Sequence, residues 1–263
     1  MLVVRTAADL QDYLFTSMNV SVLLKKGNLS QKQKNVIKIG TQKELKGKKL
    51  AVPKSYEFSC TTAEIIIRAC DDRGAAQGCY YLEDLMNLRE APFLTQGKID
   101  RRPAFSPRMV HSGWQLDRYP DAYLSSIAHH GFDTILFFTT EVDSTPTGYL
   151  DFNDLVDRAA GFGIDVYLYT RMLSDRHPDD PDAGNYYSNS YGKLFRKCPG
   201  AKGIIFVGES CGFPSKDPRT AGSNTVLEEE GIRPKKTVER LFPELRFSAM
   251  AQSDRKNNTS RIS

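Results

Sequence analysis

The sequence predicts an α/β protein in which a small α+β domain precedes a run of alternating strands and helices. Three observations support this class. Short β-branched stretches and an amphipathic helix occupy the first 100 residues. Proline-rich residues 91–107 then interrupt the periodic pattern, as is typical of a domain boundary. Beyond residue 108, strand and helix patterns alternate at the spacing of βα units around a parallel sheet.

The first part reads as a sheet with a helix on one face. A short helix is expected at residues 9–17, and the clearest helix opens at Asp72 and ends before Ala91 because its apolar residues recur at helical spacing. Strands are expected at residues 20–24, 36–39, 56–60 and 64–69. The lysine-rich stretch 42–49 reads as a solvated connection. Nothing in this part forms a catalytic constellation.

The second part carries about four βα units. Pro120 suits the start of a helix, and Gly131 suits its end. Strands are expected from Met109 and at residues 134–139, 165–170 and 203–207, with helices at 120–129, 151–160 and 186–196. Four units fit half of an eight-stranded βα barrel or one open sheet. The pattern fails after Arg219, so residues 223–263 are expected to be irregular or disordered.

Composition excludes several classes of protein. The 36 basic and 32 acidic residues give a net charge of +4 without an interleaved aromatic and basic patch, which argues against a nucleic-acid partner. The first residues fit neither a signal peptide nor a membrane span. Five scattered cysteines indicate free thiols in the cytoplasm and no metal site. No glycine-rich phosphate loop is present, and no cofactor is expected. The oligomeric state stays open.

One carboxylate stands out by its position. The apolar run 204–207 follows Gly203 and has the composition of a strand buried on both faces. Glu209 lies just past its carboxyl end, where α/β barrels and open α/β sheets do their chemistry. Position alone leaves a helix-capping or loop glutamate equally open.

Four stretches between residues 56 and 218 carry a family resemblance, namely EIIIRAC, DDRGAAQGCYYLEDLM, RRPAFSPRMVHSGW and GIIFVGES. The first two resemble the small domain that precedes the barrel in two families of glycoside hydrolases, the β-N-acetylhexosaminidases and the α-glucuronidases. The third resembles the entry into the hexosaminidase barrel, and the fourth resembles the strand that delivers the general-acid glutamate in both families. The resemblance implies a hexosaminidase-like α+β domain at 1–100 and the first half of an incomplete (β/α)8 barrel at 101–222. It also implies a chain truncated at its C-terminal end before the later strands.

The same resemblance implies a carbohydrate-active hydrolase that cleaves glycosidic bonds, with Glu209 as general acid and an oligosaccharide or glycoside as substrate. Such cleavage also needs a second carboxylate as base or nucleophile. The resemblance implies that Arg108 binds sugar hydroxyls. The alternative is that Arg108 is a surface residue of the linker without a role in binding. Trp114 is a candidate to stack on a sugar face or to pack in the core. Candidate second carboxylates at or beyond strand ends are Asp117, Glu141, Asp143 and Asp175; Asp117 is also expected to contact substrate.

One departure from the hexosaminidase pattern limits the resemblance. Hexosaminidases carry an Asp-Glu pair in which the aspartate orients the acetamido group of the substrate. Gly208 occupies the aspartate position here, which argues against substrate-assisted cleavage of N-acetyl sugars. Two alternatives to an active hydrolase therefore stay open. One is a non-catalytic sugar-binding module, and the other is an inactive fragment from a truncated reading frame.

Overall fold

The computed structural model describes residues 2–27, 34–111, 118–171, 180–207 and 246–249 of the 263-residue chain. These residues divide into two compact units, which are described separately. The first unit comprises the described residues up to 111 together with 118–135 and 154–165. The second comprises 136–153 and the described residues from 166 onward. None of the described helices is long and apolar enough to cross a membrane.

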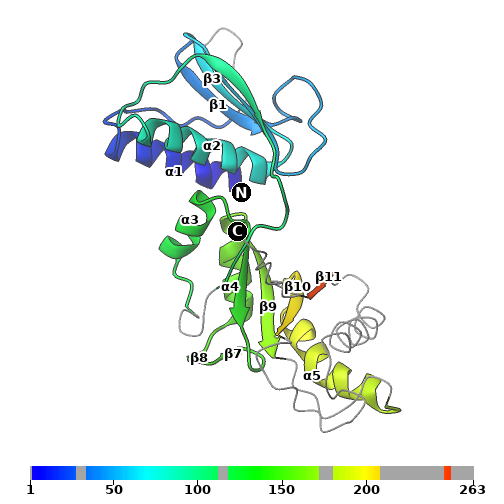
Figure 1. The fold of residues 1–263 in the computed structure, drawn as a ribbon. Coiled ribbons are helices and arrows are strands. Elements are labelled where there is room, and N and C mark those ends of the chain that lie inside the picture. Colours follow the sequence, from blue (N-terminus) through cyan, green and yellow to red (C-terminus); the bar gives the residue numbers. More distant parts are fainter. Residues whose placement is uncertain (1, 28–33, 112–117, 172–179, 208–245, 250–263) are drawn as a thin grey trace, which may run out of the picture. The chain divides into compact units, whose positions relative to one another are not determined.

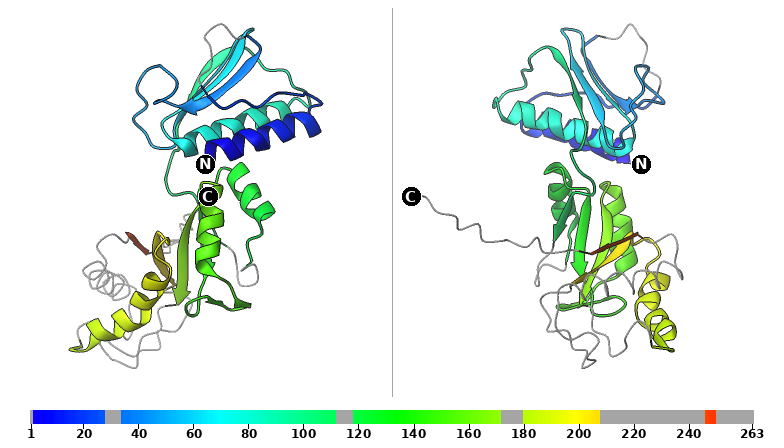
Figure 2. Two further views of the ribbon diagram at one scale, coloured as in Figure 1. Left: turned by 180° about the vertical axis from the view of Figure 1, so that it is seen from behind. Right: turned by 45° about the vertical axis from the view of Figure 1, so that its right-hand side comes forward.

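The first unit contains a mixed four-stranded sheet with two helices against one face (Figure 1). The strands follow the order β1-β3-β2-β4, in which β1 and β3 are parallel and β2 is antiparallel to both neighbours. The elements are α1 (Leu2–Thr16), β1 (Val36–Thr41), β2 (Tyr56–Cys60), β3 (Glu64–Ala69), α2 (Asp72–Asn87) and β4 (Gly97–Arg101). Helices α1 and α2 lie side by side in all views (Figure 2).

Apolar residues at helical spacing explain this packing. Helix α1 buries Leu10 and Leu14, and α2 buries Cys79 and Leu82, against inward-facing sheet residues such as Ile67. The two helices and the sheet thus share one hydrophobic core.

The start of α2 is fixed by a cap. Asp71 has an extended backbone, and its side chain accepts a hydrogen bond of 2.9 Å from the Gly74 backbone N–H. Its other carboxylate oxygen accepts a bond of 2.8 Å from the backbone N–H of Lys54. The cap therefore ties the helix to the turn that precedes β2.

The βα part forms a sheet with strand order β11-β10-β9-β6-β5. Strand β10 is parallel to both β9 and β11. Each strand neighbours the next one in the chain, as successive βα units require. The elements are β5 (Met109–His111), α3 (Asp121–His129), β6 (Thr134–Phe138), α4 (Phe152–Gly161), β9 (Asp165–Arg171), α5 (Ala183–Lys197), β10 (Gly203–Val207) and β11 (Arg246–Ala249). The predicted α/β class with a small α+β domain and a partial barrel is confirmed.

Several elements differ from expectation. Helix α1 begins at Leu2 rather than at residue 9. Residues 20–24 form no strand; the Val22 carbonyl accepts a bond from the Gln11 side chain instead of pairing with a strand. The expected linker 91–107 contains β4, which completes the sheet through its pairing with β2. Strand β11 lies within the segment 223–263 that was expected to be irregular.

The first unit also includes helices from beyond residue 100, and the domain boundary expected there stays a prediction. Helices α3 and α4, expected in the barrel segment, contribute mostly or wholly to the first unit. A hydrogen bond and an ion pair between α2 and α3, described below, bind α3 to the α+β part, and sequence periodicity does not reveal such contacts.

Candidate functional site

The loops that follow parallel strands are where α/β folds place their chemistry. Trp114, Asp117, Asp175 and Glu209 follow β5, β9 and β10 in the sequence, and all four lie outside the described residues. The backbone of β10 is described as far as Val207, and Glu209 is the second residue beyond it. The loop after β6, residues 139–151, is described completely.

A backbone hydrogen bond joins the start of the loop after β6 to β9, and hydroxyl groups make further bonds within the loop. The backbone N–H of Thr139 donates to the Tyr169 carbonyl at 2.9 Å, and its Oγ1 donates to the Glu141 carbonyl at 2.6 Å. The hydroxyls of Thr140 and Ser144 lie 2.9 Å apart. The loop continues into a two-stranded hairpin of β7 (Ser144–Thr145) and β8 (Gly148–Tyr149). This edge of the second unit is therefore polar and well fastened.

The two candidate carboxylates in this loop differ in their contacts. Asp143 has a positive φ of 53°, and its Oδ1 accepts a bond of 3.1 Å from the Phe152 backbone N–H at the start of α4. This bond caps a backbone N–H at the start of α4 and engages one of the two oxygens of the carboxylate. Glu141 is exposed, and its carboxylate has no hydrogen-bond or ion-pair partner among the described residues. Glu141 is therefore the better candidate of the two for a second carboxylate.

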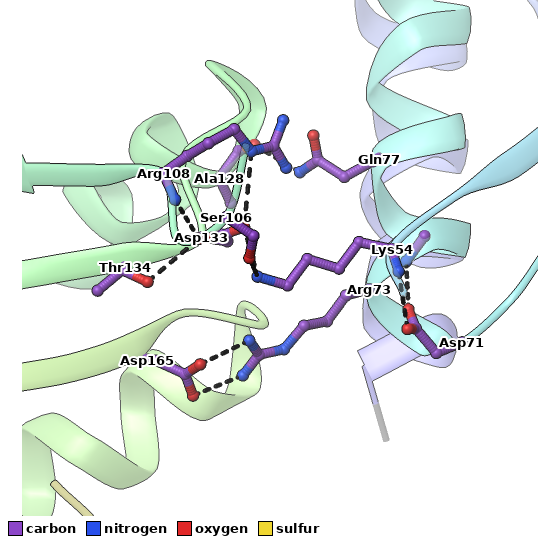
Figure 3. Close-up of polar contacts among 11 residues, drawn as sticks. Lys54, Asp71, Arg73, Gln77, Ser106, Arg108, Ala128, Asp133, Thr134 and Asp165 are labelled. Atoms are coloured by element: carbon purple, nitrogen blue, oxygen red, sulfur yellow. Dashed lines mark hydrogen bonds and ion pairs between the residues drawn. The ribbon is translucent and has the colours of Figure 1, made fainter. Parts of the chain in front are cut away.

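Arg108 lies at the other end of a strand, immediately before β5. Its backbone N–H donates to Asp133 Oδ1 at 2.8 Å, and its Nε lies 3.5 Å from Asp133 Oδ2 (Figure 3). The ammonium group of Lys54 lies 2.6 Å from the same Oδ2, and the Thr134 hydroxyl donates to Oδ1 at 3.1 Å. One buried carboxylate thus gathers a lysine, an arginine and a hydroxyl.

These contacts decide the charge of Asp133. Its burial raises the pKa of the carboxyl group, but the bonds from Lys54, from the Arg108 backbone and from Thr134 lower it more. The net pKa is below the ordinary value for aspartate. Asp133 is therefore ionised at neutral pH, and its pairing with Lys54 is a true ion pair.

A second ion pair lies beside the first (Figure 3). Arg73 of α2 donates from both terminal nitrogens to the two oxygens of Asp165, at 2.8 and 2.7 Å. The hydrogen bonding to Asp165 raises the pKa of the Arg73 guanidinium. Gln77, one turn further along α2, donates to the Ala128 carbonyl of α3 at 3.2 Å. Helix α2 is therefore bonded to α3 and to the first residue of β9.

A histidine forms the third such contact. His129 Nε2 of α3 lies 3.2 Å from Glu83 Oε2 of α2, and its ring lies 4.0 Å from that of Tyr80, centroid to centroid. Burial lowers the pKa of His129, but bonds to Glu83 and to the Ser125 carbonyl raise it more, so the net pKa is above the ordinary value. The protonated form is thus favoured by the fold.

These pairs form a polar network at the amino ends of strands. Asp133 directly precedes β6, and Asp165 is the first residue of β9. Parallel α/β folds place stability there and chemistry at the opposite ends. Arg108 contacts Asp133 at this end of the strands, and its role in sugar binding stays a prediction. Among the described residues, no group of three or more potential ligands could hold a metal ion.

Sequence reasoning missed the network. Its members are far apart in the chain. They come from the turn before β2, from α2 and from the starts of β6 and β9. The one available signal was an aspartate at the start of each of two buried strands, Asp133 and Asp165. A carboxylate at that position needs a cation, and the sequence alone does not show which one reaches it.

Comparison with known proteins gives a clear result only at the level of structure. No protein-family profile matches the sequence, and no curated protein sequence matches it. Among solved structures, a chitobiase from Flavobacterium johnsoniae aligns over 94% of this chain with a TM-score of 0.64 and 13% identity. A family 20 β-N-acetylhexosaminidase from Streptomyces coelicolor aligns over 95% of this chain with a TM-score of 0.62 and 11% identity. A β-N-acetylhexosaminidase from Bacteroides fragilis aligns over 92% of this chain with a TM-score of 0.60 and 13% identity.

These likenesses show the fold. The chain spans 47% of the length of the chitobiase, 60% of the Streptomyces enzyme and 59% of the Bacteroides enzyme. The resemblance seen in the sequence is therefore confirmed as a shared fold, a small α+β domain joined to successive βα units. Identity of 11 to 13% leaves individual residue roles open.

Proposed function

We propose that the protein is a carbohydrate-active hydrolase that cleaves glycosidic bonds, with Glu209 as its general acid. The observation that carries the proposal is the position of Glu209. It follows a strand that is paired in parallel on both sides, in a fold shared with glycosidases. A carboxylic acid in that place can protonate the leaving oxygen of a glycoside if its surroundings raise its pKa.

The proposal assigns the remaining roles at the same edge of the sheet. Asp117 and Trp114, in the loop after β5, contact the substrate, and Trp114 stacks on a sugar face. Glu141 is proposed as the second carboxylate, because it is exposed after β6 and is not used as a helix cap. The expected substrate is an oligosaccharide or a simple glycoside.

The test is turnover of a panel of aryl glycosides by the whole chain and by Glu209→Gln. The glutamine keeps the size of the side chain but cannot supply a proton. We expect the variant to lose about 100-fold to 10,000-fold in kcat/KM, the usual contribution of general acid catalysis. Asp12→Asn, on the exposed surface of α1, is the matched control and should keep full activity.

Three results would contradict parts of this assignment. Equal activity of Glu209→Gln and the unchanged protein removes Glu209 from the mechanism. Unchanged activity of Glu141→Gln removes Glu141 as the second carboxylate. A thermal shift on sugar addition without any turnover of the panel would replace the hydrolase by a non-catalytic sugar-binding protein.

A further inference from the structure

The connection between β1 and β2 carries an unusual density of positive charge. Four lysines lie within seven residues, and all four side chains are exposed. They are Lys43, Lys46, Lys48 and Lys49. We call residues 42–50 the lysine loop. Sequence alone suggested a solvated connection here, but the contacts of its backbone show a more definite structure.

The lysine loop is fastened at both ends and in its middle. The Gln42 amide donates to the Leu50 carbonyl at 3.0 Å and accepts from the Leu50 N–H at 2.9 Å, which closes the loop. The guanidinium of buried Arg68 donates to the Lys48 carbonyl, and Glu57 pairs with that guanidinium from the sheet. A Cβ atom at Gly47 would collide with Arg68. Holding the loop in one conformation reduces the entropy lost on binding.

The charges of the loop are not neutralised within the described part of the protein. None of its four ammonium groups lies within 4 Å of a carboxylate there. The one acidic residue of the loop, Glu44, turns its Oε2 back to the Thr41 backbone N–H at 2.7 Å and to the Thr41 hydroxyl at 3.2 Å. Four cations therefore face solvent on a fixed backbone, where they repel one another.

We propose that the lysine loop is a docking site for an anionic polysaccharide, one that carries sulfate or carboxylate groups along its chain. The choice of polymer rests on the proposed glycosidase function. The choice of an anion rests on the loop itself, since compact ammonium groups spaced along a fixed loop can each meet one charged group of a repeating polymer. Contacts of this kind release counterions and weaken steeply with salt.

Fluorescein-labelled chondroitin sulfate is the probe, and fluorescence anisotropy at several NaCl concentrations is the measurement. We expect binding that weakens as salt rises. Changing all four loop lysines to glutamine should lower affinity at least tenfold and flatten the salt dependence. The matched control changes four exposed lysines elsewhere to glutamine, namely Lys25, Lys26, Lys193 and Lys202. It has the same net charge and should stay within about twofold of the unchanged protein.

A second variant tests the fixed backbone. Gln42→Leu keeps every lysine but removes the clamp to Leu50, so affinity should fall while the salt dependence persists. Circular dichroism melting confirms that each variant is folded. Equal loss in the loop and control variants would overturn the proposal, as would binding to neutral dextran with the same affinity. Tighter binding to duplex DNA or to anionic phospholipid vesicles than to chondroitin sulfate would also overturn it.

Aryl glycoside turnover separates this proposal from the proposed function. The loop variants should hydrolyse small uncharged glycosides as the unchanged protein does, because such substrates offer the lysines no anion. Lost polysaccharide binding with intact turnover supports the docking site. Retained polysaccharide binding in the lysine variant overturns the docking site and leaves the hydrolase assignment in place.

Discussion

The guanidinium group of Arg73 in α2 and the carboxylate of Asp165 in β9 are joined by two parallel hydrogen bonds of 2.8 and 2.7 Å. The pair joins residues 92 positions apart in the sequence. Both side chains are more than two thirds buried, so water competes weakly for their hydrogen bonds. The two bonds therefore hold α2 to the start of β9 within the first unit.

Replacing Arg73 by lysine should destabilise the protein although the charge is kept. Lysine cannot make the bidentate contact, so one charge-assisted bond is lost, at a cost of about 1–3 kcal/mol. The midpoint of urea unfolding, followed by circular dichroism, measures the change. Arg102→Lys, at an exposed position, is the control and should leave the midpoint unchanged. Equal midpoints for Arg73→Lys and the unchanged protein would show that the fork adds nothing.

Lys54 and Asp133 should be energetically coupled. In a double-mutant cycle of Lys54→Met and Asp133→Asn, we expect a coupling energy of about 1–3 kcal/mol, because Lys54→Met removes the nearest cation of Asp133 and Asp133→Asn removes the anion that Lys54 pairs with. The pKa of Asp133 is lowered by the fold, so its stabilisation is complete above the unfolded value and is lost as pH falls through the lower folded value. Asp133→Asn should lack this acid-dependent loss. The exposed Asp100→Asn should retain it, and an additive cycle would refute the coupling.

His129 should make the protein less stable toward alkaline pH. Its pKa is raised in the folded state, so its contribution is complete below the unfolded pKa of about 6.5 and is lost as pH rises through the folded pKa. Urea midpoints measured from pH 5 to about 9 should show this decline. The decline should be smaller in His129→Gln and unchanged in His130→Gln, the exposed neighbour. Identical profiles for both variants would exclude the Glu83 contact as its cause.

Two glycines in helices should respond in opposite ways to alanine. A Cβ atom at Gly78 of α2 would collide with the Ile67 side chain, so Gly78→Ala should destabilise by about 1–3 kcal/mol. A Cβ atom at Gly184, the second residue of α5, meets nothing within 4 Å, so Gly184→Ala should stabilise by less than the roughly 1 kcal/mol expected in a helix interior. Thermal melting of both variants checks the pair. Destabilisation by both changes would mean that glycine is required for a reason other than close packing.

Local pattern was enough to predict most of the fold. Strands β2 and β3 have the predicted bounds, and β10 does as well, because short β-branched runs between breakers leave few alternatives. The pattern failed where a strand forms only if a neighbouring strand is available for pairing. Residues 97–101 are all exposed, and they form β4 by pairing with the edge that β2 offers. The apolar residues 20–24 lack such a partner and form no strand.

The site was less predictable than the fold for a related reason. The sequence is enough to predict that Glu209 comes just after β10, because this follows from chain order alone. The use of Asp143 as a cap of α4 depends on a positive φ and on the approach of the Phe152 N–H, which no periodicity reports. Likewise, the partners of Arg108 became apparent only when Asp133 and Lys54 were placed in space.

Strand β4 has one consequence for the behaviour of the protein in concentrated solution. It is an outer strand of its sheet, so one row of its backbone N–H and carbonyl groups faces outward. Such an edge can recruit strands of other chains and start aggregation. Here the edge strand is short, and its exposed residues include the charged Lys98, Asp100 and Arg101. A foreign strand would have to pair beside these charges, which protects this edge of the sheet from association with other chains.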